Sequence, residues 1–145
     1  MLNRSFFHTV LLLLLVSLSD LAQAQIADIN SAINKAGRQR MLSQRMAKFY
    51  QAAAWKVVGT QLSPEVNKAR SEFSAVVQEL SVSPNNTQAL RDELDLVKQQ
   101  WIFFENALNQ PAGTEKALSV NVATTSERIL ETMENVVSLY EKISK

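Results

Sequence analysis

The chain has 145 residues, of which 46% are hydrophobic, and a formal net charge of +1 at pH 7. This length and composition are typical of a single globular domain, and the near-neutral charge argues against nucleic-acid binding. Three glycines and three prolines are too few for a sheet-rich fold with many tight turns. The chain contains no cysteine, which excludes a disulfide framework and leaves packing as the source of stability.

Residues 1–24 have the three parts of an export signal. A short positive region at Arg4 precedes a mainly apolar stretch, which ends at a small-residue cleavage site over residues 22–24. The uninterrupted apolar run, residues 10–16, is far shorter than the roughly 20 residues that a spanning helix needs. We therefore expect a cleaved signal peptide, a mature chain that begins near Gln25 and a periplasmic location; a retained anchor is the alternative.

The first two helices have recognisable ends. The first is expected over residues 26–58 and ends at Gly59. The second begins at Ser63 and Pro64, because serine can cap a helix and proline is favoured at the first helical position. The apolar residues of the second helix repeat at intervals of three and four, as on one helical face. They are Val66, Ala69, Phe73, Val76, Val77 and Leu80.

Two further helices follow a break at residues 83–87. The third has apolar residues at heptad spacing and ends at residues 110–113, and Thr114 can cap the fourth. The heptad residues are Leu90, Leu94, Val97, Trp101, Phe104 and Leu108, and the apolar seam of the fourth helix is Leu118, Val122, Thr125, Ile129, Met133, Val136, Tyr140 and Ile143. Four amphipathic helices with short connections predict an all-α fold, an antiparallel up-down four-helix bundle, whose outer two helices are the longer ones.

Arg40 has an unusual position in the first helix. At about 100° per residue, it lies in the middle of an apolar stripe that includes Ile33 and Ala47. Its neighbours one turn away, Gly37 and Ser43 among them, are mostly small, so the backbone there can approach a partner closely or leave a hollow. A glycine inside a helix costs about 1 kcal/mol relative to alanine, and an unpaired buried guanidinium costs several. These two costs together indicate a compensating interaction.

Two interpretations of Arg40 remain. In the structural one, the guanidinium pairs with a carboxylate from another helix or extends past the seam to solvent. In the functional one, it faces a small cavity and binds an anion through its planar fork of donors. The charge distribution favours the second, because there is no acidic residue between Ile29 and Pro64. The basic residues of this stretch are Lys35, Arg38, Arg40, Arg45, Lys48 and Lys56.

The sequence around Arg40 resembles a known family. The pattern Asn34-x-Ala36-Gly37-x-x-Arg40-Met41-x-Ser43-x-Arg45 is similar to the signature of periplasmic four-helix sensor domains. That group includes the nitrate/nitrite sensor kinases and the PilJ-type N-terminal domain of type IV pilus methyl-accepting chemotaxis transducers. The continuous string over residues 36–45 is more similar to the PilJ-type branch.

This resemblance implies a ligand site on the first helix. In the nitrate sensors, the arginine that matches Arg40 holds the anion at the dimer axis, one from each protomer's first helix. Arg40 is therefore implied as the primary ligand contact, and Gly37 as the position that lets two helices approach. Arg45 is implied as a supporting residue, and Ser43 and Gln44, one turn from Arg40, complete the candidate ligand-binding set.

We expect residues 25–145 to form a PilJ/nitrate-sensor-like domain that binds a small anion or polar ligand, with nitrate or nitrite as an extrapolation. Members of the family continue through a second membrane helix into signalling modules, and this sequence contains neither. The domain is therefore expected to act as a homodimer through its first helix, together with a partner receptor. The alternative is a structural module without a ligand, whose apolar faces, residues 101–104 among them, dock a pilus or chemoreceptor component.

Catalysis and cofactor binding are not expected. Beyond the signal segment the chain has no histidine and no cysteine, which excludes the haem and di-iron sites of other four-helix proteins. No nucleophile-base pair, glycine-rich phosphate loop or metal-spaced carboxylate cluster is visible. The sequence therefore predicts a binding domain with no enzyme activity, no cofactor and no metal.

Overall fold

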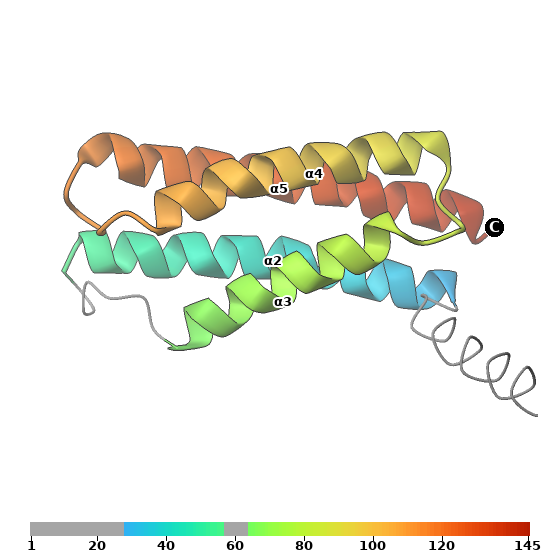
Figure 1. Cartoon of the computed structure of the whole chain (residues 1–145), viewed down its shortest axis with the longest axis horizontal. Helices are drawn as coiled ribbons and strands as arrows, with labels where there is room; N and C mark the ends of the chain where they lie inside the picture. Colours follow the sequence, from blue (N-terminus) through green and yellow to red (C-terminus); the bar gives the residue numbers. More distant parts are fainter. Residues whose placement is uncertain (1–27, 57–63) are drawn as a thin grey trace, which may run out of the picture.

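The structure is a computed structural model that describes residues 28–56 and 64–145, and these residues form four helices and no strand (Figure 1). The helices are α2 (Ile29–Ala54), α3 (Pro64–Ser81), α4 (Gln88–Leu108) and α5 (Lys116–Ile143). The prediction of an all-α fold is confirmed. The outer helices have 26 and 28 residues and the inner ones 18 and 21, as expected. The predicted signal peptide, Gly59 and the Ser63 cap lie outside the described residues. The predicted first helix, residues 26–58, is too long: α2 begins after the Asp28 N-cap and ends at Ala54, because Lys56 has a φ of +59° that cannot continue a right-handed helix.

Each helix packs lengthwise against its neighbours. α5 lies along both α2 and α4, whereas α3 packs on α2 and less extensively on α4 (Figure 1). Gln44 and Gln51 of α2 donate hydrogen bonds from Nε2 to the carbonyls of Ser126 and Ser119, at 3.1 and 2.6 Å. The residue number rises along α2 while it falls along α5, so these helices run in opposite directions. The contacts are compatible with the predicted antiparallel up-down bundle.

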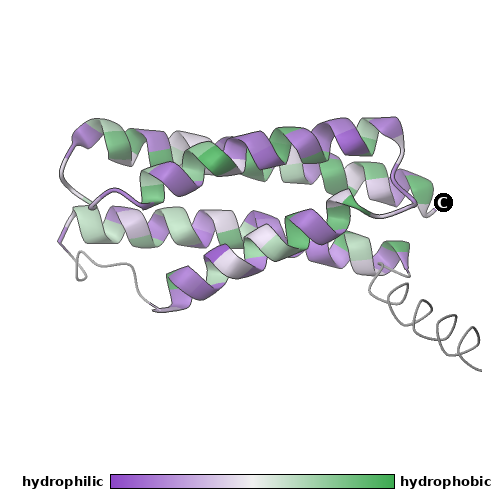
Figure 2. Cartoon of the chain, viewed as in Figure 1, coloured by the Kyte–Doolittle hydropathy of each residue, from purple (hydrophilic) through white to green (hydrophobic). Residues whose placement is uncertain are grey.

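The core forms where the apolar faces of the four helices meet. All six heptad residues of α4 are buried, as predicted. Trp101 stacks on Phe73 of α3 with ring centroids 4.4 Å apart, and its Nε1 donates to Ser74 Oγ at 3.1 Å. Hydrophobic and hydrophilic residues are interspersed along every helix (Figure 2). Within the described ranges, no helix reaches the combination of length and hydropathy that a membrane-spanning segment requires.

The α4–α5 connection corrects one prediction. Thr114 does not cap α5: the N-cap residue is Glu115, which makes no capping bond, and Thr114 Oγ1 donates instead to the Pro111 carbonyl at 2.8 Å. The Thr114 hydroxyl therefore stabilises the turn between α4 and α5 instead of capping α5. Gly113 has a φ of +82°, and a Cβ there would lie 3.1 Å from the Ala54 carbonyl oxygen, so glycine allows this connection to approach the end of α2.

A buried side chain, Asn86, joins three segments at the opposite end of the molecule. Its Nδ2 donates to the Leu80 carbonyl at the end of α3 at 2.7 Å, and its Oδ1 accepts from the Tyr140 hydroxyl of α5 at 2.8 Å. The Arg91 side chain of α4 donates to the Asn86 carbonyl at 2.8 Å. Burial raises the pKa of Tyr140 to about 12, so its hydroxyl stays protonated and able to donate at physiological pH. Asn86 therefore satisfies polar groups that packing removes from water.

Asn86→Ala is expected to destabilise the fold, because it leaves the buried Tyr140 hydroxyl without its acceptor and removes one of the two donors to the Leu80 carbonyl. The expected loss is about 1–3 kcal/mol in the free energy of unfolding, measured by urea denaturation. Asn85→Ala changes the exposed neighbour and is the matched control, with an expected effect within about 0.5 kcal/mol. Equal stability of the two variants would contradict the role given to Asn86.

Candidate functional site

The five residues predicted to form the ligand site all lie on α2, but they face different surroundings. Arg40 and Gln44 lie at the seam with α5, and Ser43 is buried. Gly37 is half-buried and Arg45 is exposed. The structure therefore brings the predicted site residues together only in part.

Arg40 lies at the edge of the buried face of α2 rather than at its centre, so the predicted central position is wrong. The arginine side chain is 36% exposed. The buried residues of α2 are Ala32, Ala36, Gln39, Leu42, Ser43, Met46, Ala47, Tyr50 and Ala53. At 100° per residue, this face is centred near Ala32 and Tyr50, roughly 80° from Arg40. The reason is that α2 packs against α3 as well as α5, which widens and rotates its buried face.

The Arg40 guanidinium pairs with a carboxylate of α5. Its Nη1 lies 3.3 Å from Glu134 Oε1, and the Glu134 side chain is 57% exposed. Its Nη2 lies 3.8 Å from the point that a Cβ at Gly37 would occupy, an ordinary van der Waals distance, so the guanidinium lies beside Gly37. The structure therefore shows the contact expected from the structural interpretation of Arg40, an ion pair with a carboxylate of another helix. This ion pair is partly exposed.

The other basic residues of the first half of α2 pair with α3. Lys35 Nζ binds Glu79, and Arg38 binds Glu72 through two nitrogens, with Nη2 donating to Oε2 at 3.2 Å. The hydrogen bond from Arg38 lowers the pKa of the Glu72 carboxyl, and the same contact raises the pKa of Arg38. Two of the six basic residues of this stretch are thus paired with carboxylates of a neighbouring helix. The seven-residue spacing of Glu72 and Glu79 on one helical face is the sequence signal for this pairing.

Three of the predicted site residues have structural contacts. Ser43 Oγ donates to the Arg40 carbonyl one turn earlier at 2.9 Å. Gln44 donates to the Ser126 carbonyl, and also to Ser126 Oγ at 3.4 Å. The Arg45 guanidinium carbon lies 5.8 Å from the centroid of the Phe49 ring, within range of a cation–π contact. Arg40 and Gly37, with Glu134, therefore make up the candidate site that remains.

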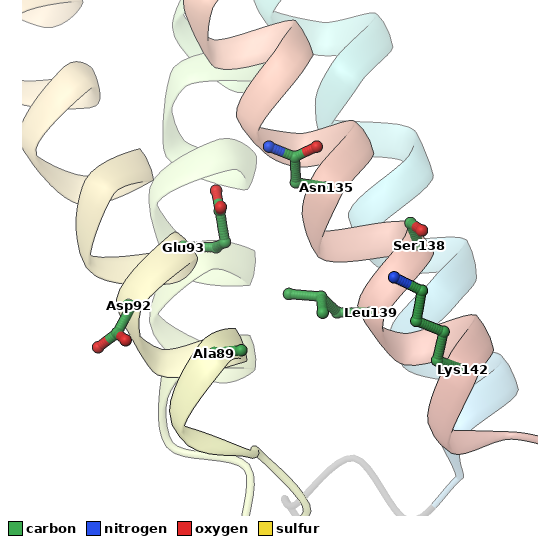
Figure 3. A pocket seen from close by; sticks show the side chains of 7 residues that line it. All are labelled: Ala89, Asp92, Glu93, Asn135, Ser138, Leu139 and Lys142. Carbon is green, nitrogen blue, oxygen red and sulfur yellow. The ribbon is translucent and has the colours of Figure 1, made fainter.

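Three cavities between α3, α4 and α5 were not predicted from the sequence. The α4–α5 cavity, of about 470 Å³, is lined by Ala89, Asp92, Glu93, Asn135, Ser138, Leu139 and Lys142 (Figure 3). A second, of about 340 Å³, also lies between α4 and α5, and a third, of about 330 Å³, lies between α3 and α4. None of these three is lined by a residue of α2. No sequence signal pointed to them, because their linings join the polar faces of separate helices.

A metal centre finds no support in the described residues, which contain no cluster of three or more His, Cys, Asp or Glu side chains able to hold an ion. The polar groups of the site are instead suited to hydrogen bonding and charge pairing. A guanidinium with one partly exposed carboxylate partner can bind an anion, whereas it supplies neither a nucleophile nor a base.

Comparison with known families decides the classification. The family model for the N-terminal domain of type IV pili methyl-accepting chemotaxis transducers, PilJ, matches residues 21–126. The chain belongs to the PilJ family. The match extends from the N-terminal region through α4 and into the first part of α5. The resemblance noted around Arg40 is therefore confirmed.

PilJ domains are sensor domains of chemotaxis transducers, so the chain is a helical domain of the sensing and signalling class. The family is not a catalytic one. No curated protein and no solved structure matches the chain. Membership therefore establishes the class of this PilJ-type domain, and the ligand has to be argued from its own residues.

Proposed function

We propose that this PilJ-type domain, as an antiparallel up-down bundle, binds a small anion at Arg40, with nitrate and nitrite as the first candidates. The observation that carries the proposal is that Arg40, which lies within the family's motif, is partly exposed and weakly paired. Its one ion-pair partner in the described residues is Glu134, which is itself mostly exposed. The domain binds without catalysis, and a partner receptor transmits the signal.

The Arg40–Glu134 contact is weak enough for an anion to replace it. Exposed ion pairs contribute about 0.2–1 kcal/mol, because water screens the charges and ordering two side chains costs entropy. A planar anion can accept two parallel hydrogen bonds from a guanidinium, which the single contact to Glu134 does not provide. The Arg40 side chain is 36% exposed, so an anion can reach it from solvent. Lys35 and Arg38, by contrast, are held by carboxylates of α3.

Self-association through α2 would complete the site. The α2 outer face (Gly37, Met41 and Trp55) combines a residue without a side chain with two exposed apolar ones. At 100° per residue, these three lie within about 100° of Arg40 on one side of the helix. A second copy packed on this face would bury apolar surface and bring two Arg40 guanidiniums toward one anion. Displacement of Glu134 by the anion would then shift α2 relative to α5 by a small distance.

Nitrate or nitrite at millimolar concentration is expected to raise the melting temperature of the protein. A ligand at 100 times its dissociation constant adds about 2.7 kcal/mol to the free energy of unfolding, which corresponds to several degrees. The measurement is thermal unfolding by circular dichroism, with chloride at equal ionic strength as the reference. Arg40→Ala should remain helical and lose the shift.

Lys48→Ala is the matched control, since it removes one positive charge from an exposed position of the same helix. This variant should keep the full response to nitrate. If both variants lose the nitrate-induced rise in melting temperature equally, the rise is an effect of net charge and the proposed site at Arg40 is refuted. If a broad panel of anions and small polar metabolites leaves the wild-type melting curve unmoved, the anion proposal fails.

Gly37→Leu is expected to weaken self-association at least about tenfold, because a leucine side chain would separate the two α2 outer faces. Sedimentation equilibrium measures the effect, and Ser71→Leu, at an exposed position of α3, is the control. Met41→Asp should act in the same direction without touching Arg40. A wild type that is monomeric at high concentration would contradict the proposed dimer.

The proposed location is the periplasm, on the basis of the export signal over residues 1–24. The prediction is that the protein recovered from the periplasm of an expressing bacterium begins at or near Gln25, by intact-mass measurement. Recovery of the chain from the cytoplasm with its first residues in place would contradict it.

A second candidate function is a docking module for a pilus or chemoreceptor component. The observation in its favour is the pair Ile102 and Phe103 on α4, which are 57% and 70% exposed. These two residues lie between the buried residues Trp101 and Phe104 in the sequence. Large apolar side chains that are exposed together are typical of contact surfaces. The anion panel separates the two functions, because the docking module predicts no response to any small ligand.

A further inference from the structure

The α4–α5 cavity gathers opposite charges between two helices. Its walls come from the first two turns of α4 and the last three turns of α5. Figure 3 shows the Glu93 carboxylate and the Asn135 amide extending into the space between the helices. The Lys142 ammonium group points back along α5 toward Ser138, whereas the Asp92 carboxylate points away from the cavity. A negative and a positive group thus border one hollow.

One polar atom of this lining, on Glu93, is buried without a partner, whereas Asn135, Ser138 and Lys142 are exposed. Glu93 Oε2 is inaccessible to water and accepts no hydrogen bond from any described residue. Neither Glu93 nor Lys142 forms an ion pair within the described part of the chain, although charged side chains of both signs reach the same hollow. The Glu93 carboxylate therefore has no positively charged partner among the described residues, and its other oxygen, Oε1, is the atom that a bound cationic group would contact.

We propose that the α4–α5 cavity binds a small zwitterion that carries an ammonium and a carboxylate group, an amino acid or a close analogue. The ammonium group donates to Glu93 and to the Asn135 amide oxygen. The carboxylate accepts from Lys142 and from the Ser138 hydroxyl. Leu139 and Ala89 form the apolar part of the lining and contact the carbon atoms of the ligand.

Size and charge together favour this class of ligand. A volume of about 470 Å³ lies within the range of roughly 300–1,000 Å³ that is typical of small-molecule sites. A simple cation would approach the Lys142 ammonium group unfavourably, and a simple anion would approach the Glu93 carboxylate unfavourably. A zwitterion satisfies both groups at once, and does so without adding net charge to the domain.

The cavity is distinct from the Arg40 site but shares a helix with it. Glu134, which pairs with Arg40, and Asn135, which lines the cavity, are consecutive residues of α5. A ligand between α4 and α5 therefore acts on the same helix that an anion at Arg40 would release. The zwitterion site does not depend on the anion proposal, and either can fail alone.

The test is isothermal titration of the wild-type domain with the twenty proteinogenic L-amino acids and β-alanine. At least one is expected to bind with a dissociation constant below about 1 mM. For that ligand, Glu93→Gln and Lys142→Met should each weaken binding by about tenfold or more. The corresponding simple amine and simple carboxylate, which carry one charge each, should bind at least about tenfold more weakly than the zwitterion.

Glu141→Gln is the matched control, because it removes one negative charge from an exposed residue of α5 that does not line the cavity. It should change the affinity less than about twofold, and Arg40→Ala should leave it unchanged. Thermal unfolding of Glu93→Gln checks that the variant folds, which is expected because it removes a group without a partner. No binding by any zwitterion, or equal binding by the amine or carboxylate alone, overturns the proposal.

Discussion

The packing of α2 between two helices is the constraint on which the rest of the structure depends. Because α3 and α5 both lie against α2, its buried face is wide and is centred between them. The same packing divides the basic residues of α2 between two neighbours. Lys35 and Arg38 pair with α3, whereas Arg40 reaches the seam with α5. One basic residue is thereby left with a weak, partly exposed partner, which is the basis of the proposed anion site.

The core of the bundle contains several buried polar side chains from α2 and α5. Gln39, Ser43, Ser126 and Thr132 are buried. Thr132 accepts a hydrogen bond from Gln100 of α4 at 3.0 Å, whereas Gln39 Oε1 has no partner among the described residues. Buried polar groups add less to stability than apolar ones, and less still when unpaired.

α5 is the element that connects the proposed sites. Its residues contact α2 on one side, through Glu134 and Ser126, and line the α4–α5 cavity on another. A small displacement of α5 alters both contacts, because side chains one residue apart face different neighbours. The exposed Phe103 of α4 lines the second cavity between the same two helices. The features that point to function therefore concentrate around α5, although the sequence motif lies on α2.

The sequence by itself determined the local structure and the family. Apolar spacing placed the core face of α4 at all six positions, and the string around Arg40 indicated the PilJ family, because both depend on residues close together in the chain. Only the tertiary structure decided what each face meets. It moved Arg40 to the edge of the buried face and gave it Glu134 as a partner, 94 residues away. It also brought Glu93 and Lys142 to one cavity, since the packing of separated helices sets such contacts and no local pattern encodes it.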